Sequence, residues 1–332
     1  MSLLITGGLG YIGSHTIIQL LNNGHDIVIV DNLSNSTESI SSKIELITNK
    51  KCIFYNVDVC DIDSLNSVFL KHDITDVIHF AGLKSVSESV NHPLFYYDTN
   101  VVGTVNVLKA MRKNNIRNFI FSSSATVYGN PVEIPLKESS DIGATTNPYG
   151  RSKFITECIL KDLALSDPSW NITVLRYFNP VGAHTSGLIG ERPIGVPNNL
   201  VPYITQVAAG LRKRLYVYGN DYPTKDGSGV RDFIHVDDLA SGHLAALNNL
   251  NKTGFKVYNL GTGKAYSVFE LISTFEKVNN VNIPYEISPR RNGDVAECWS
   301  DPSLAKKELG WVATHSLDDM LRDAWKWELS LL

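Results

Sequence analysis

Short apolar, β-branched runs alternate with longer amphipathic stretches through the first half of the chain. The runs have the length and composition of buried parallel strands, and the stretches between them have helical spacing. The expected strands are residues 3–6, 27–30, 53–56, 77–80, 119–122 and 172–176. The expected helices are residues 12–22, 62–70, a long one at 94–114, and 148–165. This alternation predicts an α/β fold of the Rossmann type, a doubly wound parallel sheet with helices on both faces.

The pattern becomes less regular after residue 179, where Gly and Pro interrupt shorter elements. A chain of 332 residues is long enough for two cores of unequal size. We therefore expect residues 1–179 to form the domain built on the parallel sheet. Residues 180–332 are expected mainly in a smaller, mixed α/β lobe that binds substrate, with a segment near 233–249 returning to the first domain.

Composition and charge narrow the classes of partner. The formal net charge is −4 and no basic block is present, so we do not expect nucleic-acid binding. No apolar stretch approaches the roughly 20 residues of a membrane span, and the apolar start is too short for a signal peptide. The four cysteines lack CxxC spacing, which indicates reduced thiols in a cytoplasmic protein and no metal site.

A glycine-rich turn follows the first expected strand. Gly7, Gly10 and Gly13 have G-x-x-G-x-x-G spacing. The first allows a tight turn, the second lets backbone approach a pyrophosphate, and the third allows close helix–strand packing. Tyr11 and Ile12 begin the following helix, whose free N–H groups and partial positive charge favour phosphate. The turn predicts a dinucleotide site.

Acidic residues at the next two strand ends suggest which dinucleotide binds. Asp31 ends the second strand, where a carboxylate accepts ribose hydroxyls and repels a 2′-phosphate, which favours NAD. The alternative is a turn-capping aspartate in the Asp31-Asn32 pair. Asp58 and Val59 follow the third strand at the expected adenine edge, where a simple turn aspartate is the other interpretation.

A tyrosine and a lysine four residues apart predict chemistry at the same edge. Tyr149 and Lys153 share one helix face, and the serines at 122–124 end the fifth strand, at the edge where open α/β sheets bind ligands. A phenol titrates near pH ~10, and a nearby ammonium with a positive nicotinamide ring lowers that pKa. We expect Tyr149 to act as base, Lys153 to lower its pKa and bind the nicotinamide ribose, and Ser124 to steer the proton.

Longer motifs show a resemblance to a known family. The chain has TGGLGYIGSH at 6–15, DNLSNS at 31–36, FAGLKSVSES at 80–89, FSSSATVYG at 121–129, NPYGRSK at 147–153, RYFNPVGAH at 176–184, DGSGVRDFIHVDDLA at 226–240 and GDVAECW at 293–299. Over nearly its whole length it resembles the UDP-glucose 4-epimerase family of extended short-chain dehydrogenases/reductases. The resemblance implies 4-epimerisation of UDP-hexoses through a transient 4-keto sugar, with hydride passing to NAD and back. It also implies a homodimer joined by a four-helix bundle.

The resemblance extends the set of site residues. Beyond the residues above, the cofactor site includes Asn35, Ser36, Phe80, Ala81, Gly82, Lys84, Ser122 and Phe178. The UDP-sugar site includes Lys84, Ser124, Tyr149, Asn179, Asn199, Leu200, Tyr218, Arg231, Arg291, Asp294 and Cys298. The guanidinium groups suit a pyrophosphate. Thr99 replaces an Asn found in some members, so position 99 is left out.

Three other functions fit parts of the pattern. A nucleotide-sugar 4,6-dehydratase needs acidic residues just after the strand-end serine, and this chain has Ala125 and Thr126 there. A UDP-glucuronate 4-epimerase, or another nucleotide-sugar short-chain dehydrogenase, is closer in chemistry, but the motifs fit the glucuronate enzyme less well. A non-catalytic NAD sensor could dispense with the phenol and the ammonium.

Cys298 bears on substrate breadth. In this family a large Tyr at this place is associated with rejecting N-acetylated sugars and a small residue with accepting them. Cysteine leaves space for an acetamido group, which predicts interconversion of UDP-GlcNAc and UDP-GalNAc as well. The alternative is that Cys298 is a small core residue and another side chain closes the pocket.

Overall fold

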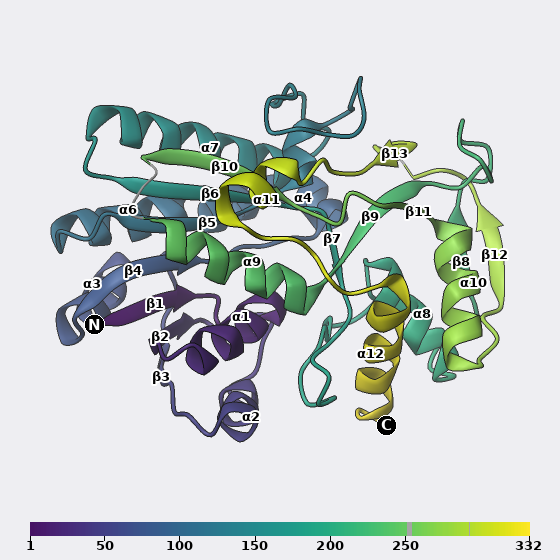
Figure 1. Cartoon of the computed structure of the whole chain (residues 1–332), viewed down its shortest axis with the longest axis horizontal. Coiled ribbons are helices and arrows are strands. Elements are labelled where there is room, and N and C mark those ends of the chain that lie inside the picture. Colours follow the sequence, from purple (N-terminus) through teal and green to yellow (C-terminus); the bar gives the residue numbers. More distant parts are fainter. Residues whose placement is uncertain (251–253, 292) are drawn as a thin grey trace.

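The computed structural model describes residues 1–250, 254–291 and 293–332. Its larger layer is a seven-stranded parallel sheet of order β10-β6-β5-β4-β1-β2-β3 (Figure 1). The strands are β1 (Ser2–Thr6), β2 (Asp26–Asp31), β3 (Ile53–Asn56), β4 (Ile74–His79), β5 (Asn118–Ser124), β6 (Asn171–Tyr177) and β10 (Phe255–Leu260). The order reverses between β1 and β4, which confirms the doubly wound Rossmann-type fold and creates a crevice at the carboxyl ends of these strands.

Helices cover both faces of this sheet because successive strand residues point to opposite sides. Leu3 and Ile5 of β1 belong to a core with Ile17, whereas Leu4 belongs to a second core with Val107. The first face is covered by α1 (Tyr11–Asn22) and α9 (Val236–Asn249), and the second by α3 (Ile62–Lys71), α6 (Gly103–Lys113) and α7 (Pro148–Ser166). Each face thus has its own apolar core.

The long helix expected at 94–114 is present as a continuous helical run from residue 93 to 113 with a π-helical turn inside it. The structure has α5 (Pro93–Tyr97), a π-helical turn (Asp98–Val102) and then α6. Asn100 lies in that turn, where its Oδ1 accepts the Leu83 N–H at 2.7 Å and its Nδ2 donates to Ser152 Oγ at 2.9 Å. A π turn re-aims side chains, and here the re-aimed amide joins the loop after β4 to α7.

In the first half of the chain, the structure has two helices that were not expected from the pattern. The helix α2 (Ser39–Thr48) lies between β2 and β3, and α4 (Val86–Asn91) follows β4. In α2 the apolar face is Ile40, Ile44 and Ile47, of which only Ile44 is fully buried. These three residues have i, i+4, i+7 spacing, so the sequence does carry an amphipathic-helix signal here, which the expected helices did not include.

The smaller lobe is a mixed α/β unit with its own core. A four-stranded sheet contains β7 (Asn179–Val181), β9 (Val230–His235), β11 (Ala265–Ser267) and β13 (Glu297–Cys298), and a two-stranded sheet contains β8 (Leu215–Tyr218) and β12 (Tyr285–Ser288). The helices are α8 (Leu200–Ala208), α10 (Val268–Asn279) and α12 (Leu317–Leu329). Val201, Phe233, Leu271 and Leu321 are buried together between them.

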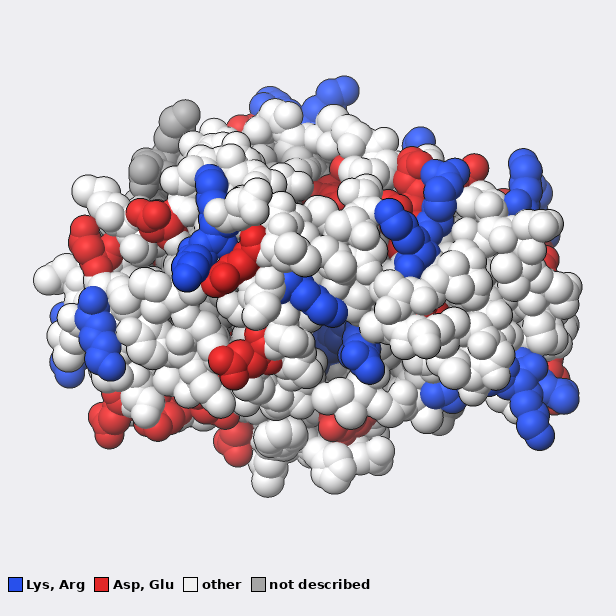
Figure 2. Space-filling view, turned by 90° about the horizontal axis from the view of Figure 1, so that it is seen from below, with Lys and Arg blue, Asp and Glu red and all other residues white. Residues whose placement is uncertain are grey.

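The chain crosses between the lobes more than once. The strand β9 belongs to the smaller lobe, α9 packs against α1, and β10 lies beside β6 at the edge of the large sheet. Within the segment expected to return near 233–249, residues 233–235 end β9 and residues 236–249 form α9, and α11 (Ser303–Leu309) packs on β10. Among the described residues, no helix is long and apolar enough to cross a bilayer. Figure 2 shows acidic and basic side chains interspersed on one face.

Candidate active site

The glycine turn packs so closely that two of its three glycines leave no room for a side chain. A Cβ on Gly7, which has φ 66°, would lie 2.6 Å from the Ala81 nitrogen, and one on Gly13 would lie 2.5 Å from the Gly7 carbonyl oxygen. At Gly10 the nearest atom would be 3.2 Å away, and no side chain caps α1 there. The first N–H groups of α1 are thus available to an anion. The turn fits a dinucleotide pyrophosphate.

Asp31 is buried at the carboxyl end of β2 and organises the neighbouring loops. Its carboxylate accepts the Leu9 N–H at 3.0 Å, the Leu33 N–H at 2.9 Å and the Ser36 hydroxyl at 2.8 Å. Leu9 lies in the glycine turn, so the carboxylate ties that turn to the end of β2. The position of Asp31 is compatible with both interpretations from the sequence, an aspartate that organises the turn and an acceptor for the ribose hydroxyls.

At the expected adenine edge, one side-chain hydrogen bond joins the loop after β2 to the loop after β3. Asn32 Nδ2 donates to Asp58 Oδ2 at 2.9 Å, and the Cys60 N–H donates to Asp58 Oδ1 at 2.8 Å. Partial burial raises the pKa of Asp58, but these hydrogen bonds outweigh it and the pKa is lowered overall. Val59 is buried beside them, and Asn35 is exposed in the loop before α2.

The three expected catalytic side chains come from two elements that meet at the carboxyl edge. Ser124 ends β5, and Tyr149 and Lys153 lie on the first turns of α7, which is capped by Asn147 accepting the Gly150 N–H at 2.9 Å. Lys153 is buried and its ammonium donates to the Ser122 carbonyl at 2.7 Å. The Ser124 hydroxyl is hydrogen-bonded to the Tyr149 phenol.

Burial has the largest effect on the pKa values of Tyr149 and Lys153. It raises the pKa of Tyr149, against the opposing effects of the Ser124 hydrogen bond and the Lys84 charge. Burial also lowers the pKa of Lys153 to about 8, against the charge of Glu157. The net direction for Tyr149 is opposite to that expected from Lys153, because desolvation of a phenolate outweighs the protein charges around it. The expectation also relied on the nicotinamide charge, which would act in the lowering direction.

A buried tyrosine–histidine pair behind the site was missed from the sequence. The Tyr177 hydroxyl is hydrogen-bonded to His243 Nε2, and His243 Nδ1 lies 2.8 Å from the Leu239 carbonyl. Burial lowers the pKa of His243 to about 4, so the ring is neutral and Nε2 accepts from Tyr177. Phe80 packs on this ring with centroids 4.8 Å apart, and Tyr177 also bonds Ser122. The two partners are 66 positions apart, a separation that no local pattern reveals.

The remaining residues expected near the nicotinamide lie around Lys153 and the end of β5. A Cβ on Gly82 would be 3.7 Å from Lys153 Nζ, which places Gly82 beside the ammonium. Phe178 is buried in a small cluster with Ala125, and Cys298 packs against that cluster. The structure thus brings Cys298 to the neighbourhood of the catalytic strand end.

Lys84 and Asn199 meet at a carboxylate that was not expected from the sequence. Glu191 Oε1 accepts the Lys84 ammonium at 2.5 Å and the Asn199 amide at 2.7 Å. Asn199 immediately precedes Leu200, the first residue of α8. Glu191 lies in an irregular stretch between β7 and α8, so neither periodicity nor motif spacing indicates it.

Other residues expected to bind the UDP-sugar form a second group in the smaller lobe. Arg291 lies over the Tyr218 ring at 4.7 Å and pairs with Asp294 at 3.0 Å. Arg231 of β9 stands opposite Cys298 of β13, and burial raises the pKa of that thiol to about 11. Asn179 begins β7, which pairs with β9. The contacts in this lobe thus form two sets, Arg291 with Tyr218 and Asp294, and Arg231 with Cys298 and the strand that Asn179 begins.

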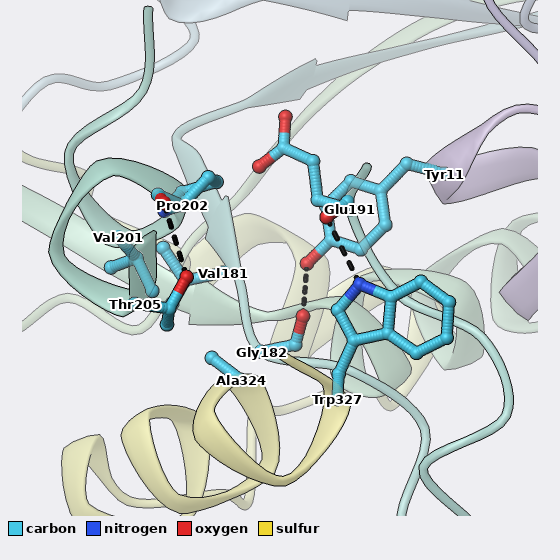
Figure 3. A pocket seen from close by; sticks show the side chains of 9 residues that line it. All are labelled: Tyr11, Val181, Gly182, Glu191, Val201, Pro202, Thr205, Ala324 and Trp327. Carbon is cyan, nitrogen blue, oxygen red and sulfur yellow. Dashed lines mark hydrogen bonds between the residues drawn. The ribbon is translucent and has the colours of Figure 1, made fainter. Parts of the chain in front are cut away.

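Tyr11 joins the two lobes. Its hydroxyl donates to the Gly182 carbonyl at 2.7 Å, and burial followed by the charge of Glu191 raises its pKa. A small cavity lies beside this contact (Figure 3). Its lining comes from both lobes: Tyr11, Val181, Gly182, Glu191, Val201, Pro202, Thr205, Ala324 and Trp327.

Comparisons with known proteins agree with this arrangement. A family model described as GDP-mannose 4,6 dehydratase matches residues 4–324. The chain is 57% identical to a UDP-glucose 4-epimerase of Yersinia enterocolitica, over 99% of this chain and 97% of that protein. A structure of UDP-glucose 4-epimerase from Bifidobacterium longum with NAD+ and UDP has a TM-score of 0.97 at 52% identity, covering 99% of this chain and 98% of that one.

A second solved structure is as similar in shape. It is a UDP-glucose 4-epimerase from Stenotrophomonas maltophila with NAD and formylated UDP-arabinopyranose, with a TM-score of 0.97, 49% identity, and coverage of 100% and 98%. The fold, the strand-end serine, the tyrosine and lysine of α7, and these likenesses together place the chain in the nucleotide-sugar dehydratase and epimerase family, and within it among the UDP-glucose 4-epimerases.

Proposed function

We propose that this protein is an NAD-dependent UDP-hexose 4-epimerase that interconverts UDP-glucose and UDP-galactose through a transient 4-keto sugar. The observation that carries the proposal is the meeting of Ser124, Tyr149 and Lys153 beside the glycine turn. This meeting occurs in a chain that is 57% identical, over nearly its full length, to a UDP-glucose 4-epimerase.

NAD is the cofactor that fits the site. The turn at Gly10 leaves backbone N–H groups for the pyrophosphate, and Asp31 stands where the ribose hydroxyls are read. Solved relatives carry NAD. Bound there, NAD would supply the chemistry of a reversible hydride acceptor for C4 of the sugar. The ring would lie by Phe80 and Phe178, and Lys153 would bind its ribose.

The protein's own groups handle the proton. Tyr149 takes the proton of the sugar 4-hydroxyl and returns it after the sugar has turned over, and Ser124, hydrogen-bonded to the phenol, steers that transfer. Lys153 is largely protonated at neutral pH, since its pKa is about 8, whereas the ammonium whose charge lowers the Tyr149 pKa is that of Lys84. Burial keeps water from the reacting atoms.

The nucleotide half of the substrate is assigned to the smaller lobe. Arg231 and Arg291 supply guanidinium groups for the pyrophosphate, and Tyr218 and Asp294 hold Arg291 in place. Asn199 contributes from the lobe junction, next to Lys84. Tight binding of the UDP group together with weak binding of the sugar would let the keto sugar rotate in the pocket.

A 4,6-dehydratase is the alternative that the family model raises, and the strand end argues against it. Dehydration needs an acid and a base beside the tyrosine. Ala125 is buried, and Thr126 donates its hydroxyl to Ser124 at 3.0 Å, so neither position supplies a carboxylate. A UDP-glucuronate 4-epimerase and a non-catalytic NAD sensor remain outcomes of the assay below.

The test is conversion of UDP-galactose to UDP-glucose by the purified protein, followed by chromatography of the nucleotide sugars. We expect equilibration of the pair from either direction, with no net consumption of NAD. Exclusive turnover of UDP-glucuronate, or accumulation of a 4-keto-6-deoxy sugar, would assign one of the alternatives. Bound NAD without turnover of any UDP-sugar would indicate the sensor.

A second substrate pair is favoured by Cys298. This side chain is only partly buried and packs against the cluster of Ala125 and Phe178, next to the catalytic strand end. A thiol there occupies far less volume than a tyrosine, and a clash in a packed site costs about 1–3 kcal/mol. We therefore extend the proposal to UDP-GlcNAc and UDP-GalNAc.

We also propose a cytoplasmic homodimer joined by a four-helix bundle from the region of α5–α6 and from α7. Exposed apolar side chains on these helices support it: Leu94 is 76% exposed, Phe95 54% and Val102 47%. Sedimentation of the wild type and of Phe95→Asp tests the dimer, which the charge should dissociate. The free cysteines support the compartment.

A further inference from the structure

Glu191 is a nearly buried carboxylate at the junction of the lobes. Its side chain is 8% exposed. One of its oxygens accepts both the Lys84 ammonium, at 2.5 Å, and the Asn199 amide, at 2.7 Å. Lys84 follows β4 in the larger lobe, and Asn199 precedes α8 in the smaller lobe. A single atom therefore joins two side chains that the proposed function places in the UDP-sugar pocket.

The backbone around Glu191 is held by other contacts. Its carbonyl accepts the Trp327 indole N–H of α12 at 3.1 Å, and Figure 3 shows the side chain beside Tyr11 with the carboxylate directed away from Trp327. Asn199 is at the N-cap position of α8, but its side chain makes no hydrogen bond to the helix. The side chain donates to Glu191 instead. The backbone of Glu191 is thus held in place by Trp327, and its carboxylate has two defined partners, Lys84 and Asn199.

A carboxylate near a pyrophosphate site repels the ligand unless a cation offsets its charge. The bond to Lys84 provides that offset, and it also holds the ammonium whose charge acts on the Tyr149 phenol. The Glu191 side chain is 8% exposed but that of Lys84 is 55% exposed. Removal of the carboxylate would therefore release the ammonium to solvent and leave the Asn199 amide without this acceptor, and both side chains would lose their positions.

We propose that Glu191 is a positioning residue for epimerisation, holding Lys84 and Asn199 so that the two lobes present one pocket to the UDP-sugar. The inference rests on the proposed function, since it takes both partners as groups of that pocket. Glu191 acts through these partners and does not touch the substrate.

The test compares Glu191→Ala and Glu191→Gln with matched variants of Glu308. Glu308 is a suitable control because its Oε2 also accepts an ammonium, from Lys256 at 2.9 Å, and a second donor, the Tyr258 hydroxyl at 2.8 Å. It lies on α11 against β10, on an edge of the large sheet that contributes no residue to the site. The measurements are kcat, KM, NAD content after gel filtration, and the unfolding midpoint.

We expect Glu191→Ala to lower kcat/KM at least about tenfold, mainly through KM, with NAD content unchanged. Glu191→Gln keeps an acceptor oxygen but not the charge, so its loss should be intermediate, at least about threefold. The Glu308 variants should stay within about twofold of wild type, as expected for a pair outside the site. Asn199→Ala should cost less in the Glu191→Ala background than alone, because the two changes remove one shared contact.

Two results overturn the inference: Glu191→Ala with kcat/KM within about twofold of wild type, or losses that simply multiply in the double variant. If Glu191→Ala does not fold, Glu191→Gln replaces it in the double-variant comparison with Asn199→Ala. Wild-type-like kinetics of Glu191→Gln would then refute the role. If the wild type shows no epimerase activity, the proposed function fails separately. The role of Glu191 is then tested by calorimetric binding of UDP-glucose. We expect Glu191→Ala to bind UDP-glucose at least about fivefold more weakly than wild type, and equal binding would refute the role.

Discussion

Replacing Tyr149 by Phe removes one oxygen atom from the first turn of α7 and leaves the ring. The phenol is hydrogen-bonded to Ser124, and burial has already raised its pKa. The hydroxyl is thus held in an environment poor in water, where only a directed proton transfer can use it. Phe keeps the packing of the ring, so the change tests the oxygen alone.

The expected loss follows from the role of that oxygen. A positioned general base contributes about 10²–10⁴-fold, so turnover should fall at least about 100-fold, or about 2.7 kcal/mol in the barrier at ~1.36 kcal/mol per decade. The free energy of unfolding should change by no more than about 1 kcal/mol, because a net hydrogen bond contributes that much and the desolvation cost is relieved. Binding of UDP should be retained, since the groups assigned to it lie elsewhere.

The assay is turnover of UDP-galactose under saturating conditions, with calorimetric binding of UDP and urea unfolding measured on the same preparations. Tyr258→Phe is the control, since it deletes a phenol oxygen bonded to Glu308, away from the site. It should keep full turnover. Turnover of Tyr149→Phe within about tenfold of wild type would refute the assignment of this residue as the base.

Three further outcomes are expected. Purified protein should release NAD(H) on denaturation after extensive washing, and Gly13→Ala should release little, because its added carbon would lie 2.5 Å from a backbone oxygen of the turn; a wild type free of dinucleotide would contradict tight retention. Wild type should turn over both the acetylated and the non-acetylated UDP-sugars, and Cys298→Tyr only the latter; equal use of the acetylated pair by both proteins would refute the pocket argument. Arg176→Met should lose about 3–5 kcal/mol of unfolding free energy, because the pair with Glu157 is buried on both sides, whereas exposed Arg214→Met should lose less than about 1 kcal/mol. Equal urea midpoints for these two variants would show that the buried pair is dispensable.

Local signals were sufficient where a residue's role depends on its near neighbours in the chain. The spacing of Gly7, Gly10 and Gly13 after an apolar run specifies a strand, a turn and a helix N-terminus, and the structure has all three. Tyr149 and Lys153 are neighbours because of helix geometry alone. The parallel sheet follows from the alternation of strand and helix.

Other features depend on residues that are distant in the chain. The π-helical turn at 98–102 accompanies the hydrogen bonds of Asn100 to Leu83 and Ser152, which helical periodicity does not encode. The helix α2 contributes one fully buried residue, Ile44, to the core beside the large sheet, which is a contact between segments distant in the chain. The place of β10 in the large sheet depends on its pairing with β6.

The sequence by itself determined the family, the cofactor class and the residue types of the chemistry, because motifs and short spacings are local properties. Only the tertiary structure decided the titration of Tyr149, since desolvation depends on what surrounds the phenol from every side. It also decided that His243 is neutral behind Tyr177, and that Glu191 joins Lys84 to Asn199. These properties arise where segments distant in the chain pack together, and no single stretch of chain contains them.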